Sequence, residues 1–255
     1  MTHLLEAHGI HKYFGGVRAV EGIDLHVDRG EVLGIIGPNG SGKTTFFNTL
    51  TGQHPPTKGK FIFDDEDITG LPPHQVTARG IARTFQNLRT FRSLTVLENV
   101  VVGEHVKQST GLFASLFRTK MWREEEKAAR ERARDCLYMV GLSRLADRLS
   151  IELSYGQQKR LELARALAGD SRLLLLDEPT SGIPLHDGME LMNLVLRIRE
   201  ERGVTVIIIE HNMRVMRSVA DRLIAMDFGK KISEGSPDHV LSDPCVITAY
   251  LGEEC

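Results

Sequence analysis

The stretch Gly37-Pro38-Asn39-Gly40-Ser41-Gly42-Lys43-Thr44 decides how the rest of this 255-residue chain is interpreted. It fits the pattern G-x-x-x-x-G-K-[ST] at every fixed position, which predicts a loop that wraps phosphates with its backbone N–H groups. Its glycines let the backbone turn inward, and a side chain at Gly42 would risk blocking the phosphates. Lys43 supplies positive charge to the β- and γ-phosphates of a nucleotide, and the Thr44 hydroxyl is a ligand for Mg2+.

The residues on both sides of this loop predict the strand and the helix that such a site needs. Residues 32–36 are apolar, as in a strand buried on both faces, and residues 44–50 contain no Gly or Pro. Thr45, at the start of that helix, is also a predicted nucleotide-binding residue. A strand, a glycine loop and a helix N-terminus in this order form an anion site, whereas a chance surface turn would lack both flanking elements.

The composition is that of a folded chain with almost no net charge. Hydrophobic residues make up 41% and charged residues 26%, enough for a full core in one domain with an inserted subdomain. The formal charge of -2 gives no general reason to expect nucleic acid as a partner. We find neither an N-terminal signal pattern nor a window near the ~18 apolar residues of a membrane span. We therefore expect a cytoplasmic protein that contacts a membrane only through a partner.

Hydrophobic patterns along the chain predict an α/β fold. Alternation in residues 4–27 and the apolar residues 61–63 predict antiparallel strands with one wet face. The apolar runs at residues 173–176 and 204–209 predict buried parallel strands, with a helix over residues 189–202 between them. A hairpin is predicted after these strands, with segments at residues 223–226 and 231–232.

A helical stretch from about residue 86 to residue 166 interrupts this α/β pattern. Helices are predicted over residues 94–102 and 121–141, the second with an apolar stripe at Ala129, Ala133, Leu137 and Val140. The apolar residues 109–117 between them are too few for a membrane span. They form either a core loop or a surface that faces a partner, and the residues alone do not choose.

Two carboxylates follow the predicted strand of four leucines, where open α/β sheets place their ligands. Asp177 would hold Mg2+ directly or through water, and Glu178 would orient or deprotonate the attacking water. The alternative is an acidic turn without chemistry. His211 ends the neighbouring strand in the same way, from which its imidazole can reach a γ-phosphate.

A third cluster, Leu153-Ser154-Tyr155-Gly156-Gln157-Gln158, opens a helix that runs to about Ala168. Ser154 and Gln157 have the spacing of a capping box, so the cluster is accounted for by a well-capped helix. The same geometry presents a hydroxyl and free amides to an anion. Local physics leaves both interpretations open.

Taken together, these motifs resemble those of the ATP-binding cassette family in order and spacing, over essentially the whole chain. The resemblance rests on the phosphate loop, Gln86, Leu153-Ser154-Tyr155-Gly156-Gln157, Asp177-Glu178 and His211. It implies an α/β fold with a RecA-like phosphate-loop core and parallel sheet, an N-terminal antiparallel β subdomain and an inserted α-helical subdomain. Residues 1–86 and 167–255 would form the core with its β subdomain, and residues 87–166 the helical subdomain.

The resemblance also implies a site shared between two subunits. In that family, two nucleotide-binding subunits close head to tail around two ATP molecules, so Ser154 and Gly156 would face the γ-phosphate of the opposite protomer. Gln86 would contact Mg2+ or water and communicate with a transmembrane partner, while Phe14, or as second choice Tyr13, would stack on adenine. The implied catalytic residues are Glu178, His211 and Gln86, and the implied metal ligands Thr44, Gln86 and Asp177. The implied nucleotide-binding residues are Phe14, Tyr13, Gly37, Pro38, Asn39, Gly40, Ser41, Gly42, Lys43, Thr44, Thr45, Ser154, Gly156 and Gln157.

Within the family, the chain resembles the ATPase subunits of branched-chain amino acid importers and their urea or amide relatives. The supporting features are Tyr155, residues 110–113, residues 209–213 and the ending at residues 246–252. This resemblance implies a second cassette subunit, identical or different, two transmembrane permease subunits and, indirectly, a periplasmic or extracellular solute-binding protein, at the cytoplasmic face of the membrane. It implies ATP and Mg2+ as cofactors and no nucleic acid.

Three alternatives are weighed against this interpretation. A lipopolysaccharide-export ATPase has a similar carboxyl end, and a soluble cassette protein would act on nucleic acid or ribosomes. A phosphate-loop kinase would lack the cluster at residues 153–158. Two positions depart from the family pattern: Tyr155 stands at a glycine-like position, and Pro184 stands where aspartate is frequent, which puts communication between protomers through that aspartate in doubt.

Overall fold

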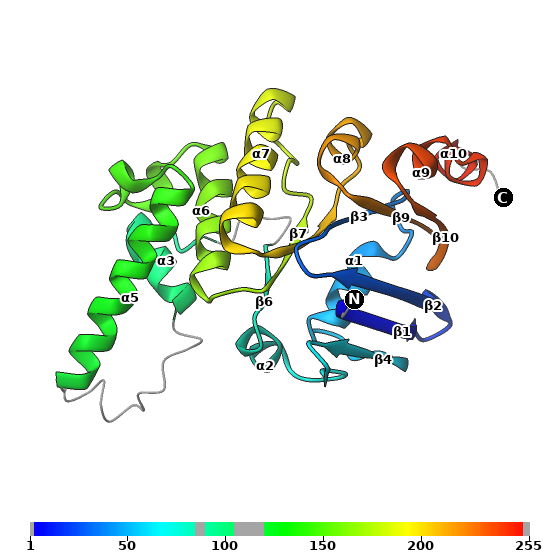
Figure 1. Cartoon of the computed structure of the whole chain (residues 1–255), viewed down its shortest axis with the longest axis horizontal. Helices are drawn as coiled ribbons and strands as arrows, with labels where there is room; N and C mark the ends of the chain where they lie inside the picture. The colour runs from blue at the N-terminus through cyan, green and yellow to red at the C-terminus, as the bar shows by residue number, and fades with distance from the viewer. Residues whose placement is uncertain (1–2, 85–89, 105–119, 252–255) are drawn as a thin grey trace. The chain divides into compact units, whose positions relative to one another are not determined.

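The computed structural model describes residues 3–84, 90–104 and 120–251, without the side chains of residues 120–122. The chain divides into two compact units, Met1–Arg83 with Arg172–Cys255, and Thr84–Ser171. The elements of the first unit (Figure 1) are β1 (His3–Phe14), β2 (Val17–Asp28), β3 (Val32–Ile36), α1 (Lys43–Leu50), β4 (Lys58–Phe63), β5 (Glu66–Asp67), α2 (Pro73–Ala78), β6 (Ile81–Arg83), β7 (Leu173–Asp177), α7 (Leu185–Arg202), β8 (Thr205–Ile209), α8 (Met213–Val219), β9 (Arg222–Asp227), β10 (Lys230–Gly235), α9 (Pro237–Ser242) and α10 (Pro244–Leu251).

A six-stranded sheet in the order β10-β9-β3-β8-β7-β6 forms the centre of the first unit. Strand β3 pairs in parallel with β8 and β9, and β7 pairs in parallel with β8 and β6. Only the edge strand β10 among these described strands runs antiparallel, to β9, as the predicted hairpin requires. All residues of β3, β7 and β8 are buried, which confirms the predicted buried parallel strands. The loops that follow these three strands therefore leave the sheet at one edge.

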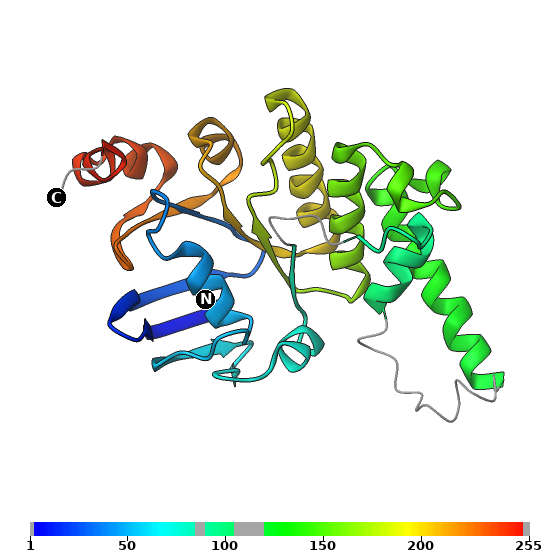
Figure 2. The ribbon, with the colours of Figure 1, turned by 180° about the vertical axis from the view of Figure 1, so that it is seen from behind.

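The N-terminal antiparallel strands form a second sheet, in the order β2-β1-β4-β5. This confirms the strands predicted from the alternation in residues 4–27 and from residues 61–63. Its apolar face shares one core with α1 and with one face of the large sheet, where Phe46, Phe47, Phe61 and Phe63 are fully buried. Figures 1 and 2 show α1 and the antiparallel sheet on one side of the large sheet and α7 and α8 on the other.

The second unit is helical, with α3 (Val96–Glu104), α5 (Lys120–Met139), two 3-10 turns η2 (Ser143–Leu145) and η3 (Ser150–Glu152), and α6 (Tyr155–Ala168). The stripe predicted along α5 is buried at all four positions, which explains why this otherwise charged helix packs. After α5 ends, Gly141 adopts a φ of +75°, the left-handed conformation that favours glycine at the end of a helix. The predicted apolar segment 109–117 lies outside the described residues, so its two interpretations stay open.

Among the described residues, no helix is long and apolar enough to cross a membrane. The parallel core, the antiparallel sheet and the helical stretch within the α/β pattern agree with the predicted fold class.

Candidate functional site

The predicted phosphate loop links the end of β3 to α1. Gly37, Gly40 and Gly42 have φ values of +148°, +83° and +99°, a region that side chains other than glycine rarely adopt. A Cβ at Gly37 would lie 2.1 Å from the carbonyl oxygen of Met226, and one at Gly42 2.3 Å from that of Ala19. The chain's own backbone therefore requires glycine at both positions, which adds a structural reason to the one predicted for Gly42.

Lys43 begins α1 and is buried, with 7% of the residue exposed. Its ammonium donates hydrogen bonds to the carbonyl oxygens of Gly37 at 2.7 Å and Pro38 at 2.8 Å, and to Ser41 Oγ at 3.1 Å. Burial lowers the pKa of Lys43, while the negative charges of Glu178 and Asp177 oppose that shift. The lysine thus lies within electrostatic reach of both predicted carboxylates, and its donors are held by the loop's own oxygens.

Asp177 is the last residue of β7 and forms a buried ion pair with Arg83. Oδ2 of Asp177 accepts from Nη2 of Arg83 at 2.7 Å, and the two side chains are only 4% and 7% exposed. Arg83 ends the neighbouring strand β6 and also donates to Asn48 Oδ1 in α1 at 2.7 Å. Arg83 was not among the residues predicted for the site. The sequence does contain a pattern that could have identified it: Arg83 is a charged residue at the end of an apolar strand, as Asp177 is.

Glu178 follows Asp177 with a φ of +50°, a left-handed conformation that costs about 1 kcal/mol or more for a residue with a side chain. Its backbone N–H donates to the carbonyl oxygen of Ile209 at 2.9 Å, so the turn remains attached to β8. This conformation brings the Glu178 carboxylate to 3.5 Å from Nδ1 of His211, which is half exposed. The turn after β7 therefore presents Glu178 to His211, the second residue after β8.

Glu210 connects the same two loops and was also missed. It is 1% exposed, and its carboxylate accepts from the Thr180 N–H at 2.8 Å and the Thr180 hydroxyl at 2.5 Å. Its other oxygen accepts from the His211 N–H at 3.3 Å. A buried carboxylate with these donors fixes the loop after Glu178 relative to His211.

The two aromatic candidates for an adenine contact differ in their surroundings. The hydroxyl of Tyr13 lies 2.8 Å from Nδ1 of His11, and the Phe14 residue is 43% exposed at the end of β1. The Phe14 ring meets the His54 ring edge to face, with centroids 5.5 Å apart, and the Lys12 ammonium lies 5.0 Å from its centroid. Of the two rings, Phe14 is the more exposed, and Tyr13 is partly buried.

The predicted signature residues lie in the second unit and are described by themselves. Ser154 is the N-cap of α6 and forms both bonds of the predicted capping box with Gln157. A Cβ at Gly156 would meet nothing within 4 Å. Tyr155 opens the helix and is exposed. The capping box explains Ser154 and Gln157, but nothing around Gly156 in the described chain requires a glycine there.

The remaining predicted residues are placed as follows. Thr44 is exposed and Thr45 half-buried in the first turn of α1. Gln86 lies outside the described residues. Pro184, the departure from the family pattern, is the N-cap of α7.

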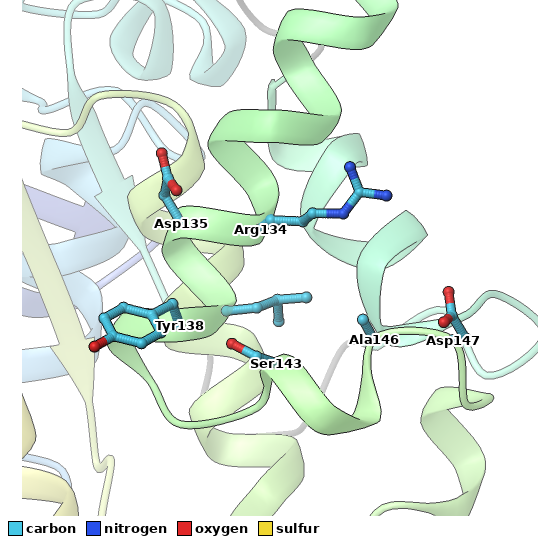
Figure 3. Close-up of a pocket in the computed structure, with 7 residues that line it drawn as sticks. Arg134, Asp135, Tyr138, Ser143, Ala146 and Asp147 are labelled. Carbon is cyan, nitrogen blue, oxygen red and sulfur yellow. The ribbon is translucent and has the colours of Figure 1, made fainter.

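A cavity of about 450 Å3 lies in the second unit, near the end of α5. Figure 3 shows Arg134, Asp135 and Tyr138 projecting from α5, with Ser143 and Ala146 in the turn that follows. None of the residues predicted for nucleotide binding lines this cavity. The candidate site therefore lies at the carboxyl ends of the parallel strands of the large sheet and not in this cavity.

Comparison with known proteins identifies the family. The family model described as ABC transporter matches residues 20–181, and the one described as branched-chain amino acid ATP-binding cassette transporter matches residues 230–255. The chain is 42% identical, over 98% of both chains, to the high-affinity branched-chain amino acid transport ATP-binding protein BraF of Pseudomonas aeruginosa.

Solved structures agree with this family. A crystal structure of the ADP conformation of an ATP-binding cassette from an ABC transporter has a TM-score of 0.87 and 37% identity, covering 99% of this chain and 100% of that one. A dimeric structure of a bacterial ABC transporter cassette has a TM-score of 0.76 and 31% identity, covering 91% and 98%. With similarity along nearly its whole length and the motifs in the predicted order, the chain belongs to the ABC transporter family.

Proposed function

We propose that this chain is the ATP-hydrolysing subunit of an importer and drives uptake of branched-chain amino acids through separate transmembrane subunits. The observation that carries the proposal is geometric: Asp177, Glu178 and His211 lie at the carboxyl ends of neighbouring parallel strands, and the buried Lys43 lies in the phosphate loop that follows β3. Family membership makes the chain an ATP-binding ATPase. The names of its relatives supply the solute class.

ATP binding uses the phosphate loop and the start of α1. The left-handed glycines turn backbone N–H groups toward the phosphates, and the helix N-terminus adds its positive partial charge. Lys43 exchanges its bonds with the loop carbonyls for bonds with phosphate oxygens. Because burial already disfavours its charge, an anionic partner restores the interaction that water would have supplied. Phe14 stacks on the adenine.

Two of the proposed Mg2+ ligands fit a hard cation. The Thr44 hydroxyl is exposed beside the phosphate loop, and the Asp177 carboxylate supplies a negative oxygen. Arg83 holds that carboxylate in one orientation, and Gln86 is the third proposed ligand. When bound, Mg2+ would neutralise charge on the phosphates.

Glu178 acts as the base in hydrolysis. It accepts a proton from the water that attacks the γ-phosphate, and His211, next to its carboxylate, contacts the same phosphate. The strained backbone at Glu178 and the bonds of Glu210 to both loops keep these two side chains adjacent. The positions of the base and the imidazole are thereby set before the nucleotide arrives.

The signature residues complete the site of a second protomer. Ser154, Gly156 and Gln157 contact the γ-phosphate bound by the partner, which explains a glycine at a position where the chain itself leaves open space. The existence of a dimeric relative supports this arrangement. The second cassette is identical or different, and the dimer docks on two permease subunits at the cytoplasmic face of the membrane.

The alternatives have less support. The relatives are named for branched-chain amino acid transport and not for lipopolysaccharide export. The formal charge of -2 gives no general reason to expect a function on nucleic acid. In the proposed importer, a solute-binding protein outside the membrane would deliver the amino acid to the permeases.

The test is co-expression of the chain with its permease subunits, followed by reconstitution into vesicles and measurement of labelled leucine uptake with solute-binding protein and ATP. Uptake that the Glu178→Gln variant abolishes would support the proposal. Co-purification with nucleic acid in place of permeases, or uptake unaffected by Glu178→Gln, would reject it.

A further inference from the structure

A side chain from the C-terminal helix contacts the first residue of the phosphate loop. The backbone N–H of Gly37 donates a hydrogen bond to the hydroxyl of Tyr250, with 2.7 Å between nitrogen and oxygen. Tyr250 lies near the end of α10, 213 residues along the chain. The end of the chain is thus in direct contact with the loop proposed to hold phosphates.

Gly37 needs this acceptor because it lies just beyond the pairing of its strand. The register between β3 and β9 ends at Ile36 and Ala225. Gly37 is buried, and its φ of +148° begins the turn of the loop. A buried N–H without a hydrogen-bond acceptor costs about 1–3 kcal/mol of stability. Because Gly37 lies beyond the last paired residue of β3, the Tyr250 hydroxyl serves as that acceptor in place of a neighbouring strand.

The hydroxyl is a stable acceptor near neutral pH. Burial raises the pKa of Tyr250 to about 12, although the hydrogen bond from Gly37 opposes this shift. The group therefore stays neutral through the physiological range, and its bond to Gly37 does not depend on pH there.

The start of α10 is tied to the large sheet, which limits where Tyr250 can move. Asp243 accepts from the Ser233 hydroxyl of β10 at 2.6 Å and from the backbone N–H of Cys245 at 2.9 Å. Val246 and Ala249 of the same helix are buried. The hydroxyl is thus presented to Gly37 by a helix anchored at its first turn and along its inner face.

Both backbone polar groups of Gly37 form hydrogen bonds, and we expect only one of these two bonds to persist when a nucleotide binds. Its carbonyl oxygen accepts from Lys43, and its N–H donates to Tyr250. When Lys43 turns to the phosphates, the carbonyl loses that donor and the bond to Tyr250 remains. Resting on the proposed ATPase function, we infer that Tyr250 is a positioning residue that holds the phosphate loop in its binding conformation, so that the C-terminal helix adjusts nucleotide affinity.

The inference is tested with Tyr250→Phe, which keeps the ring and removes the hydroxyl, in the full-length protein. Tyr138→Phe is the matched control, because Tyr138 is exposed on α5. Calorimetry gives the Kd for ATP and ADP, steady-state kinetics give KM and kcat, and a thermal melt reports stability. We expect Kd and KM to rise about three- to tenfold in Tyr250→Phe with kcat within twofold, since the lost bond acts before the chemical step.

A second variant, Ser233→Ala, removes the bond that anchors the start of α10 and should shift Kd in the same direction by a smaller factor. Kd and KM unchanged in Tyr250→Phe, or a fall in kcat with KM unchanged, would overturn the inference. Lys43→Ala, measured in parallel, separates this outcome from failure of the proposed function. If Lys43→Ala weakens ATP binding and Tyr250→Phe does not, only the role of Tyr250 is lost. If the wild-type chain itself does not bind ATP, the proposed function fails.

Discussion

Arg83 and Asp177 end adjacent strands of the large sheet and form an ion pair that water hardly reaches, with Nη2 and Oδ2 2.7 Å apart. The carboxylate proposed for Mg2+ is therefore oriented by an arginine that no local motif identifies. Removing one member of a buried ion pair leaves the other charge buried without a partner. The resulting loss of stability is larger than the net stabilisation that the intact pair provides.

The variant Arg83→Met should destabilise the protein by about 3 kcal/mol, since it leaves the buried Asp177 carboxylate without its ion-pair partner. Urea unfolding at pH 7 measures the change. The control is Arg79→Met, which breaks a solvated pair with Glu66 and should cost less than about 1 kcal/mol. Equal unfolding midpoints for the two variants would show that the Arg83 pair has no special role in stability.

Lys43→Ala removes the charge that is proposed to neutralise the β- and γ-phosphates. We expect ATP affinity and hydrolysis to fall together, each by at least about tenfold, because the charged hydrogen bonds act in both the bound state and the transition state. A binding titration and an ATPase assay on the same preparation measure this. Wild-type affinity in the variant would count against the phosphate-loop assignment.

Thr180→Val removes the hydroxyl that donates to the buried Glu210 carboxylate and so loosens the loop that carries Glu178. We expect kcat to fall about threefold or more, with a smaller change in KM, because the loop positions the base and not the nucleotide. Thr77→Val is the control, since its hydroxyl donates to Pro73 within α2. The assay is ATP hydrolysis over a range of ATP concentrations, which gives both kcat and KM. An unaltered kcat would mean that the contact between Thr180 and Glu210 does not position Glu178.

Gly156→Ala separates a structural role of the signature glycine from a role in binding. Because a Cβ there meets no atom within 4 Å, the folded chain should accept alanine, and helix propensity favours it by up to about 1 kcal/mol. ATPase activity should nevertheless fall about tenfold or more, since the new methyl group would face the partner's phosphate.

The control for this substitution is Gly169→Ala at the other end of α6, where a Cβ would make an ordinary 3.6 Å contact. Thermal melts and ATPase assays on both variants decide the question. A Gly156→Ala protein that is as active as wild type would remove the reason for placing a phosphate there.

The elements that follow from local pattern were predictable from the sequence. The phosphate loop, the buried strands β3, β7 and β8, the stripe along α5 and the capping box at Ser154 each leave a periodicity or a fixed spacing in a short window.

The contacts that fix the site in place were not predictable. Arg83 with Asp177, Glu210 with Thr180, and Tyr250 with Gly37 join residues that are 94, 30 and 213 positions apart. Such pairs leave no spacing in the sequence, because only the sheet order brings their strands and helices together. The predicted subdomain boundaries and the roles of the site residues remain predictions.

The composite site is the central claim, and mixing a Lys43→Ala protein with a Ser154→Arg protein tests it most directly. Each variant should be inactive alone, because every site in its homodimer has one damaged half. In the heterodimer both defects fall in one site, and the other site is built from intact parts. Random pairing makes about half of the dimers mixed, each with one good site of two, so ATPase activity should recover to roughly a quarter of wild type if the sites act independently. No recovery in proven heterodimers would mean that both sites must work together, whereas full activity of Ser154→Arg alone would contradict the account.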